Sequence, residues 1–323
     1  MIGFDTITAV RRFEPSRDFR GSARPLLTST LGLPMNLDEI NEHARVKRKE
    51  LPEFNTFSVQ ELGRMPPYWG WVDCRTGISN FRMFLGGLDD GIALRFFWNG
   101  CFKKTSLRMW SSRAERERGI ILDVGAHTGT FTLAALSANP AATVVTFEPH
   151  FMNFARLNLN LRANGFGTDN TCMLAAASRN DTVPFTINTG VDYLTTAGAL
   201  GRQEGGIVFQ VNSVALDSFF SDEVKARIQL VKLNLAGHEG GCLLGMKSIL
   251  EKSRPVLFFE CTDAKTGSDM QSILAGFGYQ FYEIAEMEGT VTRVDAIAPR
   301  LDGRGNLLEF RKNRIASVSA LAV

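Results

Sequence analysis

Short apolar runs alternate with helical patterns from about residue 119 onward, and this alternation restricts the possible fold more than any other feature. Residues 120–124 and 143–147 are continuous apolar runs, typical of strands that are buried on both faces. Helical patterns follow them at residues 130–138 and 151–164. Strands that alternate with helices at this spacing predict an α/β fold with a mostly parallel sheet and helices on both faces.

The same alternation continues toward the C-terminus, with one interruption. A glycine-rich stretch at residues 198–206 is flanked by two short β-patterns, which we interpret as an inserted β-pair. The other expected elements are strands at 171–175, 230–235 and 255–260, a helix that ends near 250, a helix at 268–277, and strands near 279–284 and 306–310.

The first third of the chain has a different character. Residues 1–65 are poorly periodic, with one charged helix expected near residues 37–49. Residues 66–110 are rich in aromatic residues and glycine, including the run 95–98, and we expect short strands and turns there. We expect the aromatic side chains Trp69, Trp71, Phe97 and Trp98 in a core, with a sugar-stacking platform as the alternative. An exposed helix is expected at 111–118. We therefore divide the chain into an N-terminal arm and accessory segment (1–110) and a main domain (111–323).

Charge and cysteine content exclude several classes of protein. The net charge of +2, from 36 basic and 34 acidic side chains, does not indicate a nucleic-acid partner. The apolar runs are far shorter than the roughly 20 residues of a membrane span, and the first residues do not resemble a secretory signal. The five cysteines are scattered without a CxxC pair, so we expect neither a metal site nor disulfides, and a cytoplasmic protein. Nothing in the sequence indicates an oligomeric state.

A glycine loop follows the strand at 120–124, where ligands bind in parallel sheets. Gly125 and Gly129 have neither the GxGxxG spacing of a dinucleotide site nor the lysine of a phosphate loop. We interpret the glycines as letting the backbone approach a ligand. Asp123 precedes the loop, where a carboxylate would repel a pyrophosphate but suit a ligand with ammonium and sulfonium charges. This pattern favours S-adenosylmethionine (SAM) over NAD or ATP.

Two further features support a SAM site. Glu148 lies at the end of the next predicted strand, where a carboxylate can accept hydrogen bonds from both ribose hydroxyls. Small residues, Ala175, Ala176 and Ala177, follow the third strand and leave room for a flat adenine ring. The three features lie at the ends of successive strands, so we expect them to lie around one ligand.

These residues resemble the FkbM family of SAM-dependent methyltransferases. The resemblance covers about residues 80–311. Its motifs are Leu122-Asp123-Val124-Gly125-Ala126-His127-Thr128-Gly129, Phe147-Glu148-Pro149, the spaced Leu157, Asn160 and Asn164-Gly165, then Val214-Ala215-Leu216-Asp217, Val231-Lys232-Leu233 with Gly237-His238-Glu239, and Pro255 to Glu260. It implies the Rossmann-like class I methyltransferase fold and O-methylation of hydroxyls on sugars, glycans or natural products. The residues expected to contact SAM are Asp123, Gly125, Ala126, His127, Gly129, Thr130, Phe131, Glu148, Pro149, Ala176, Ala177 and Asn234.

The chain departs from the family pattern at positions where the family usually has acidic residues. Asn234 and Ala236 stand in place of two carboxylates after the fourth strand, and Lys103-Lys104 stands where an acid is common. A hydroxyl acceptor benefits from a base within hydrogen-bond reach. We expect the catalytic residues to be His238 as the base, Asn234 as a positioning group, and Glu260 as an alternative base at the end of the fifth strand. A further alternative is that no base is needed, because the acceptor is already acidic, as a phenol or a carboxylate is.

Several alternatives remain open at this stage. The loss of two carboxylates is compatible with a non-catalytic SAM-binding or scaffold protein. Met65-Pro66-Pro67-Tyr68 resembles the motif of amino-group methyltransferases, although methionine cannot accept from an amino group as the usual Asp or Asn does. His127 is expected to form hydrogen bonds near the methionine moiety, and His43 and His150 are expected on the surface.

Overall fold

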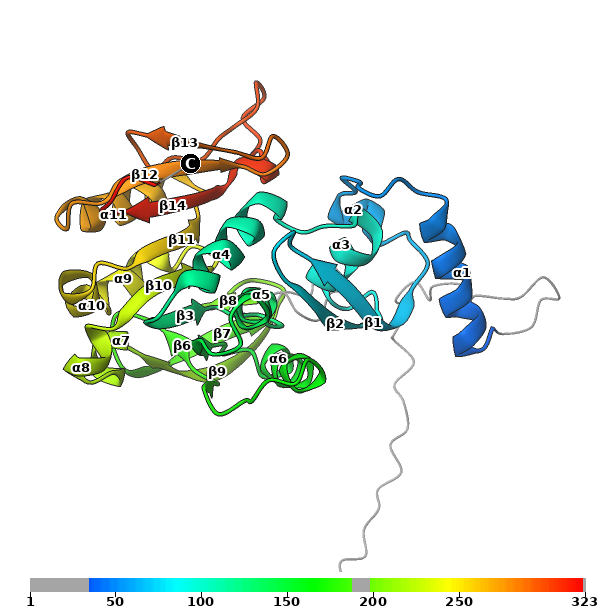
Figure 1. Ribbon diagram of the computed structural model, residues 1–323, viewed down its shortest axis with the longest axis horizontal. Helices are drawn as coiled ribbons and strands as arrows, with labels where there is room; N and C mark the ends of the chain where they lie inside the picture. The colour runs from blue at the N-terminus through cyan, green and yellow to red at the C-terminus, as the bar shows by residue number, and fades with distance from the viewer. Residues whose placement is uncertain (1–34, 188–197, 322–323) are drawn as a thin grey trace, which may run out of the picture.

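A mixed eight-stranded sheet forms the centre of the molecule (Figure 1). The structure is a computed structural model that describes residues 35–187 and 198–321. The strand order is β13-β12-β14-β11-β10-β3-β4-β5, in which β11 to β5 are parallel and the other three are antiparallel. The strands are β3 (Ile120–Val124), β4 (Thr143–Phe147), β5 (Thr171–Cys172), β10 (Ile228–Leu233), β11 (Val256–Glu260), β12 (Gln280–Ala285), β13 (Thr290–Val294) and β14 (Asn313–Ser317).

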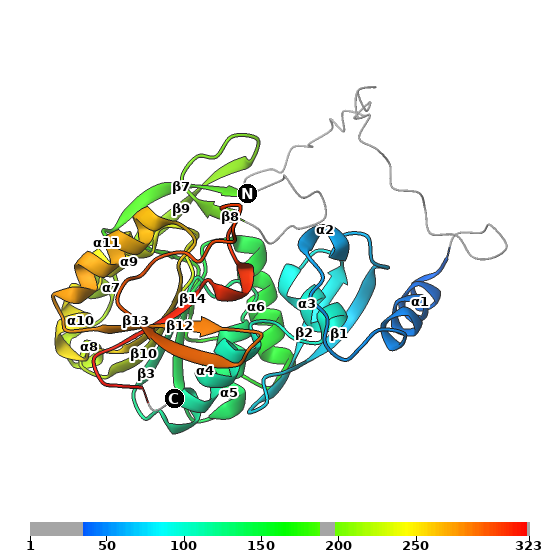
Figure 2. The same ribbon diagram turned by 90° about the horizontal axis from the view of Figure 1, so that it is seen from above.

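Helices cover both faces of this sheet, as Figures 1 and 2 show. Alternate side chains of a strand point to opposite faces, so Ile121 packs into one core and Leu122 into the other. One face carries α4 (Lys104–Arg116), α5 (Thr130–Ala138) and α6 (Phe151–Ala163). The other carries α7 (Leu216–Phe219), α8 (Asp222–Lys225), α9 (Glu239–Leu244), α10 (Lys247–Lys252) and α11 (Ala264–Ala275). The predicted α/β fold is therefore confirmed.

The N-terminal elements form a separate layer beside α5 and α6 (Figure 2). They are α1 (Leu37–Lys49), α2 (Val59–Leu62), the antiparallel pair β1 (Tyr68–Arg75) and β2 (Asn80–Gly87), and α3 (Gly91–Asn99). Asn164 of the α6 C-terminus binds both the N–H and the C=O of Arg82, at 2.8 and 2.7 Å, and Asn160 accepts from the N–H of Phe84 at 2.9 Å. The spaced asparagines thus attach the β1–β2 hairpin to the domain.

A four-stranded sheet with the order β6-β9-β7-β8 lies between β5 and β10 in the chain. Its strands are β6 (Ala175–Ala176), β7 (Asp181–Ile187), β8 (Gly198–Leu200) and β9 (Ile207–Val214). The predicted inserted β-pair is confirmed as β7 and β9, which pair antiparallel. The predicted single strand at 171–175 is wrong, because Thr171 and Cys172 pair with β4 whereas Ala175 and Ala176 pair with β9.

Three other predicted elements differ from the structure. The aromatic run 95–98 is helical, because Asp90 caps the N-terminus of α3, and Leu94 and Trp98 bury one helical face. The exposed helix expected at 111–118 is half-buried and begins at Lys104, so α4 crosses the predicted domain division. The strand expected at 306–310 is a turn with a short 3-10 helix at Glu309–Arg311. The actual strand, β14, follows it.

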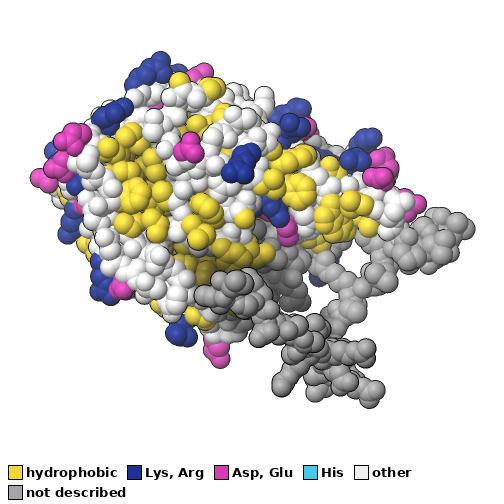
Figure 3. Space-filling model, turned by 90° about the horizontal axis from the view of Figure 1, so that it is seen from below, with side chains coloured by type: hydrophobic (Ala, Val, Ile, Leu, Met, Phe, Trp, Pro, Cys, Tyr) yellow, Lys and Arg dark blue, Asp and Glu magenta, His cyan; other side chains and the backbone are white. Residues whose placement is uncertain are grey.

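The aromatic side chains of the accessory segment divide into buried and exposed sets. Trp98 is fully buried and Phe97 stacks on Tyr68 with ring centroids 4.5 Å apart. Trp69 and Trp71 are 38% and 36% exposed, because both point to the outer face of β1, so their predicted place in the core is wrong. Figure 3 shows hydrophobic side chains gathered on the underside of the molecule.

Candidate functional site

A cavity of about 380 Å³ opens at the carboxyl ends of β3, β4 and β10. The chain passes from β3 to β4 and β5 on one side, then returns to β10 and β11 on the other, so strand order reverses beside β3. Parallel sheets bind ligands at such a reversal, and the volume lies in the range of small-molecule sites. Residues from α3, β8 and the turn at 309–312 also line this cavity, so the N-terminal layer and the inserted sheet both contribute to it.

The glycine loop forms one wall, and its conformation requires both glycines. Gly125 and Gly129 have φ values of +72° and +98°. A Cβ at Gly125 would lie 2.1 Å from the carbonyl oxygen of Asn234, and one at Gly129 would lie 2.6 Å from Leu157. Contacts within the protein therefore require glycine at both positions, and the close approach of the loop to a ligand stays a prediction. Gly125 lines the cavity through its backbone, whereas Gly129 lies behind it.

Asp123 lies beneath the loop and does not line the cavity. Its carboxylate accepts from the backbone N–H and the hydroxyl of Thr132, at 2.9 and 2.7 Å, and pairs with Lys232 at 3.1 Å. The side chain is fully buried. Lys232 also donates to the carbonyl of Gly125. Asp123 is thus placed to fix the start of α5 and the loop, and its predicted direct contact with SAM does not fit this geometry.

Glu148 lies at the carboxyl end of β4 and lines the cavity. One oxygen accepts from the N–H of His127 at 2.7 Å, and the other accepts from the N–H of His150 at 2.9 Å. Burial raises the pKa of this carboxyl group, against the opposing effects of His127 and of the backbone donors. These contacts fix the orientation of the carboxylate, and its ribose-binding role stays a prediction.

The other residues predicted to contact SAM divide into two groups. The ones that line the cavity are Ala126, His127, Thr130, Phe131, Pro149 and Asn234. Ala176 and Ala177 do not line it. Ala176 packs into the core on the far face of the sheet, and the carbonyl of Ala177 lies against Gly245. Of the three alanines, Ala175 reaches the cavity, together with Phe185 of the inserted sheet.

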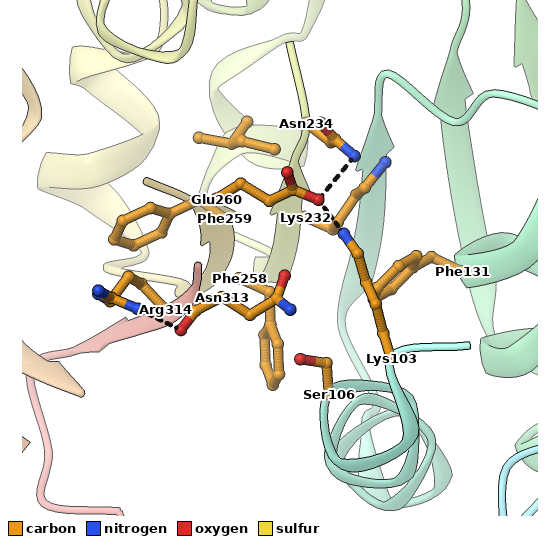
Figure 4. Close-up of a pocket in the computed structure, with 11 residues that line it drawn as sticks. Lys103, Ser106, Phe131, Lys232, Asn234, Phe258, Phe259, Glu260, Asn313 and Arg314 are labelled. Atoms are coloured by element: carbon orange, nitrogen blue, oxygen red, sulfur yellow. Dashed lines mark hydrogen bonds and ion pairs between the residues drawn. The ribbon is translucent and has the colours of Figure 1, made fainter. Parts of the chain in front are cut away.

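The opposite end of the cavity is built around Glu260, at the end of β11. Figure 4 shows Lys103, Glu260 and Asn234 pointing toward one another. Glu260 pairs with Lys103, and with Lys312 at 3.1 Å, and accepts from the side-chain amide of Asn234 at 3.3 Å. Burial alone would raise the pKa of Glu260, but the two ammonium groups hold it at about 2. Glu260 is therefore an ionised, paired carboxylate and a weak base.

His238, the predicted base, lies outside the cavity lining. Its side chain is exposed, and Nε2 lies 3.1 Å from the carbonyl oxygen of Leu200 in β8. The neighbouring Glu239 is buried and accepts from the N–H groups of Leu235 and Gly237, at 2.8 and 3.0 Å. Glu239 thus stabilises the turn after β10, while the catalytic role of His238 stays a prediction.

Two further histidines, His43 and His150, lie away from β10 and have clear structural positions. His43 is exposed on α1, as expected. His150 is fully buried, and its Nδ1 accepts from the N–H of Met152 at 3.1 Å at the start of α6. Burial lowers the pKa of His150 to about 4. Its expected place on the surface is wrong, because its ring packs against Phe151, Phe185 and Phe209.

Three lysines in the cavity had no predicted role. Lys232 interrupts an apolar run in a buried strand, and an ammonium group there requires a partner, which is a signal that the sequence contained. Lys103 was visible only as a departure from the family pattern. Lys312 had no signal, because the strand next to it was predicted in the wrong place.

Metal and membrane features can be judged for the described part of the chain. No group of three or more His, Cys, Asp or Glu side chains there could hold a metal ion, and all five cysteines are free thiols. No helix in residues 35–187 and 198–321 is long and apolar enough to cross a bilayer.

Comparison with known proteins identifies the central part of the chain. Residues 123–281 match the family described as the methyltransferase FkbM domain. This part of the chain is therefore similar to an FkbM methyltransferase domain. The family description names a methyltransferase, and the proposal below takes SAM as the methyl donor. The matched residues contain the glycine loop, Glu148, Asn234 and Glu260.

Several solved structures are similar to this chain, whereas no curated protein matches it. An FkbM methyltransferase from Methylobacillus flagellatus is 14% identical over 69% of this chain and 52% of its own, with a TM-score of 0.41. A SAM-dependent methyltransferase from Agrobacterium tumefaciens is 10% identical, over 79% and 73%, with a TM-score of 0.41. A SAM-dependent O-methyltransferase from Thermotoga maritima is 9% identical, over 69% and 67%, with a TM-score of 0.36. The match spans about half the length of the Methylobacillus protein.

Proposed function

We propose that this protein transfers the methyl group of SAM to a hydroxyl of a sugar, a glycan or a natural product. The observation that carries the proposal is Glu148: a buried carboxylate at the end of β4, oriented by two backbone N–H groups toward the cavity. SAM would lie with its ribose on Glu148 and its methionine end over the glycine loop, toward β10. When bound, it supplies the methyl group for an in-line displacement.

The chain's own residues would position the acceptor at the β10–β11 end. The amide nitrogen of Asn234 is directed to Glu260, which leaves the amide oxygen to accept from a hydroxyl. Lys312 lines the same end, and its positive charge would favour a developing alkoxide. Holding the hydroxyl in line with the methyl group supplies much of the acceleration of such a transfer.

The lining of the cavity is mixed, which fits a polyhydroxylated acceptor with an apolar part. Arg95, Glu309 and Lys312 are polar lining residues, whereas Phe102 and Leu200 are apolar. The amino-group alternative has less support, because none of the four residues of the motif from Met65 to Tyr68 lines the cavity.

The test is to incubate the protein with SAM and panels of sugars, glycans, phenols and carboxylates, and to measure S-adenosylhomocysteine. We expect product with at least one hydroxyl acceptor, and an O-methyl group by mass spectrometry and NMR. The variant Asn234→Ala should lose turnover while it still binds SAM, and Glu251→Gln, an exposed carboxylate far from the cavity, is the control. Tight SAM binding without turnover on any panel would favour the non-catalytic alternative, and an N-methyl product would favour the amino-group one.

A further inference from the structure

Lys103 combines three features that are each unfavourable for a lysine. Its backbone is left-handed, with a φ of 42°, which is uncommon for a residue other than glycine. It is the N-cap of α4, a 13-residue helix whose N-terminus carries a partial positive charge. Its side chain is only 8% exposed, and burial lowers its pKa despite the attraction of Glu260. Such costs are concentrated at positions where a function requires the geometry.

The ammonium group of Lys103 is fixed beside the glycine loop. It lies 5.7 Å from the ring centroid of Phe131, in the first turn of α5, and it pairs with Glu260 at the end of β11. It therefore lies near the end of β10, beside Asn234 and Glu260 (Figure 4). A ligand with its ribose on Glu148 would bring its other end toward this group.

Hydrogen-bond capacity distinguishes Lys103 from the other two lysines. Lys232 already contacts both Asp123 and the carbonyl of Gly125, and Lys312 contacts both Glu260 and Glu309. In the described part of the chain, Lys103 donates to Glu260 alone. An ammonium group has three donors, so two remain for a ligand.

We propose that Lys103 binds the methionine carboxylate of SAM. This inference rests on the proposed function, because it takes the cavity as the SAM site. The carboxylate is the one anionic group of SAM, and an anion next to Lys103 would compensate for both the helix N-terminus and the buried ammonium. The N–H groups of Thr105 and Ser106 are already taken by Glu286, so the lysine rather than the helix backbone would make the contact.

The competing assignment is that Lys103 contacts the acceptor instead. The two assignments differ in what happens when the acceptor is absent. If Lys103 holds the carboxylate, its loss weakens SAM binding in the absence of any acceptor. If it contacts the acceptor, the affinity for SAM alone does not change.

The experiment is calorimetry with two ligands that differ only in this carboxylate, SAM and decarboxylated SAM. Wild-type protein should bind SAM about 10- to 100-fold more tightly than decarboxylated SAM. Lys103→Met should remove most of that preference by weakening SAM, with the affinity for decarboxylated SAM changed less than about threefold. Lys104→Met, which alters an exposed neighbouring lysine over the ring of Phe54, should keep the wild-type preference.

Each outcome of the calorimetry either supports or overturns the proposed role of Lys103. Equal affinity of the wild-type protein for the two ligands overturns the proposal, as does an unchanged preference in Lys103→Met. If circular dichroism shows that Lys103→Met does not fold, Lys103→Gln is used in its place, because its amide keeps a hydrogen-bond donor for Glu260. The comparison of SAM with decarboxylated SAM on the wild-type protein does not depend on either variant. Failure of the wild-type protein to bind either ligand would instead reject the SAM site, and with it the proposed function.

Discussion

Glu148 and Glu260 occupy equivalent positions at two ends of one cavity, yet their surroundings differ. Each ends a buried parallel strand and lines the cavity. Glu148 is held by backbone N–H groups, and burial raises its pKa. Glu260 is held by Lys103 and Lys312, which keep its pKa at about 2 despite burial. The partners of a carboxylate, rather than its place in the fold, therefore decide what it can do.

The difference suits two tasks. A carboxylate fixed by backbone donors has no side-chain cation to compete with a neutral ligand hydroxyl for its remaining lone pairs. A carboxylate between two ammonium groups is a fixed counter-ion that holds the lysines in place. We infer that Glu148 faces the cofactor, whereas Glu260 organises the cations of the other end. The predictions below separate these two roles.

The largest effect is expected at Gly125, where the two ends of the cavity meet. A Cβ there would collide with the carbonyl oxygen of Asn234. Gly125→Ala should lower the free energy of unfolding by about 4 kcal/mol or more, and SAM binding should be lost with the fold. Gly165→Ala is the matched control, because Gly165 has a similar φ of +81° but nothing within 4 Å of the added carbon. It should lose only about 1 kcal/mol in urea denaturation. Equal losses would mean that the contact with Asn234 is not decisive.

Replacing Glu260 should have the next largest effect. Glu260→Gln leaves Lys103 buried without its counter-ion, so we expect a loss of about 3 kcal/mol in the free energy of unfolding at pH 7. The folded-state pKa of about 2 lies below the ordinary value of 4.5. The contribution of Glu260 is therefore complete above about pH 4.5 and is lost as the pH falls toward 2.

The free energies of unfolding of the wild-type protein and Glu260→Gln should thus differ most at pH 7 and progressively less toward pH 3. Urea denaturation at both values checks this, with Glu251→Gln as the exposed control. A difference independent of pH would show that packing, rather than charge, accounts for the effect of the substitution.

Glu148→Gln should affect cofactor binding more than stability. Burial already disfavours the charged form of Glu148, but the Gln amide nitrogen would face the N–H of His127 or His150, so the free energy of unfolding should fall by about 1–3 kcal/mol. SAM affinity should fall about 10- to 100-fold, since one of the two oxygens that accept hydrogen bonds becomes a donor. Calorimetry with SAM measures this, and Glu309→Gln, which alters an exposed carboxylate in the cavity lining, should change the affinity for SAM less than about threefold. Unchanged affinity in Glu148→Gln would remove the ribose role.

The cofactor end could be predicted from the sequence further than the other end. Glu148 and the glycine loop follow continuous apolar runs, and such local patterns specify both the strand and the residue at its end. The end around Glu260 depends on pairings between distant segments. Lys103 pairs with Glu260, which lies 157 residues later in the chain. Lys312 lies beside Glu260 because the next residue, Asn313, pairs with Glu260 between β14 and β11.

The polar sequence of β14 explains why that strand was not predicted. Asn313 and Arg314 stand in a fully buried strand, where a pattern of apolar residues is normally sought. Arg314 is buried because its guanidinium donates to the carbonyls of Asn313 and Ala298, at 2.9 and 2.6 Å, and pairs with Glu283 at 3.4 Å. Ala298 and Glu283 lie in other segments, so no local pattern indicates them.

The smallest effect is expected at His238. A catalytic base would make His238→Ala lower turnover by about 10²- to 10⁴-fold. The structure places its exposed imidazole against the carbonyl of Leu200, outside the cavity lining, with no contact to Asn234 or Glu260. We therefore expect His238→Ala to change turnover less than about threefold and the free energy of unfolding by less than about 0.5 kcal/mol. Single-turnover rates from pH 5 to 9, with the acceptor found in the panel, measure this. A large loss together with a missing acidic limb of the pH profile would show that the turn after β10 brings His238 into the cavity during catalysis. An unchanged profile would leave positioning by Asn234 and the charge of Lys312 as the sources of catalysis at this end.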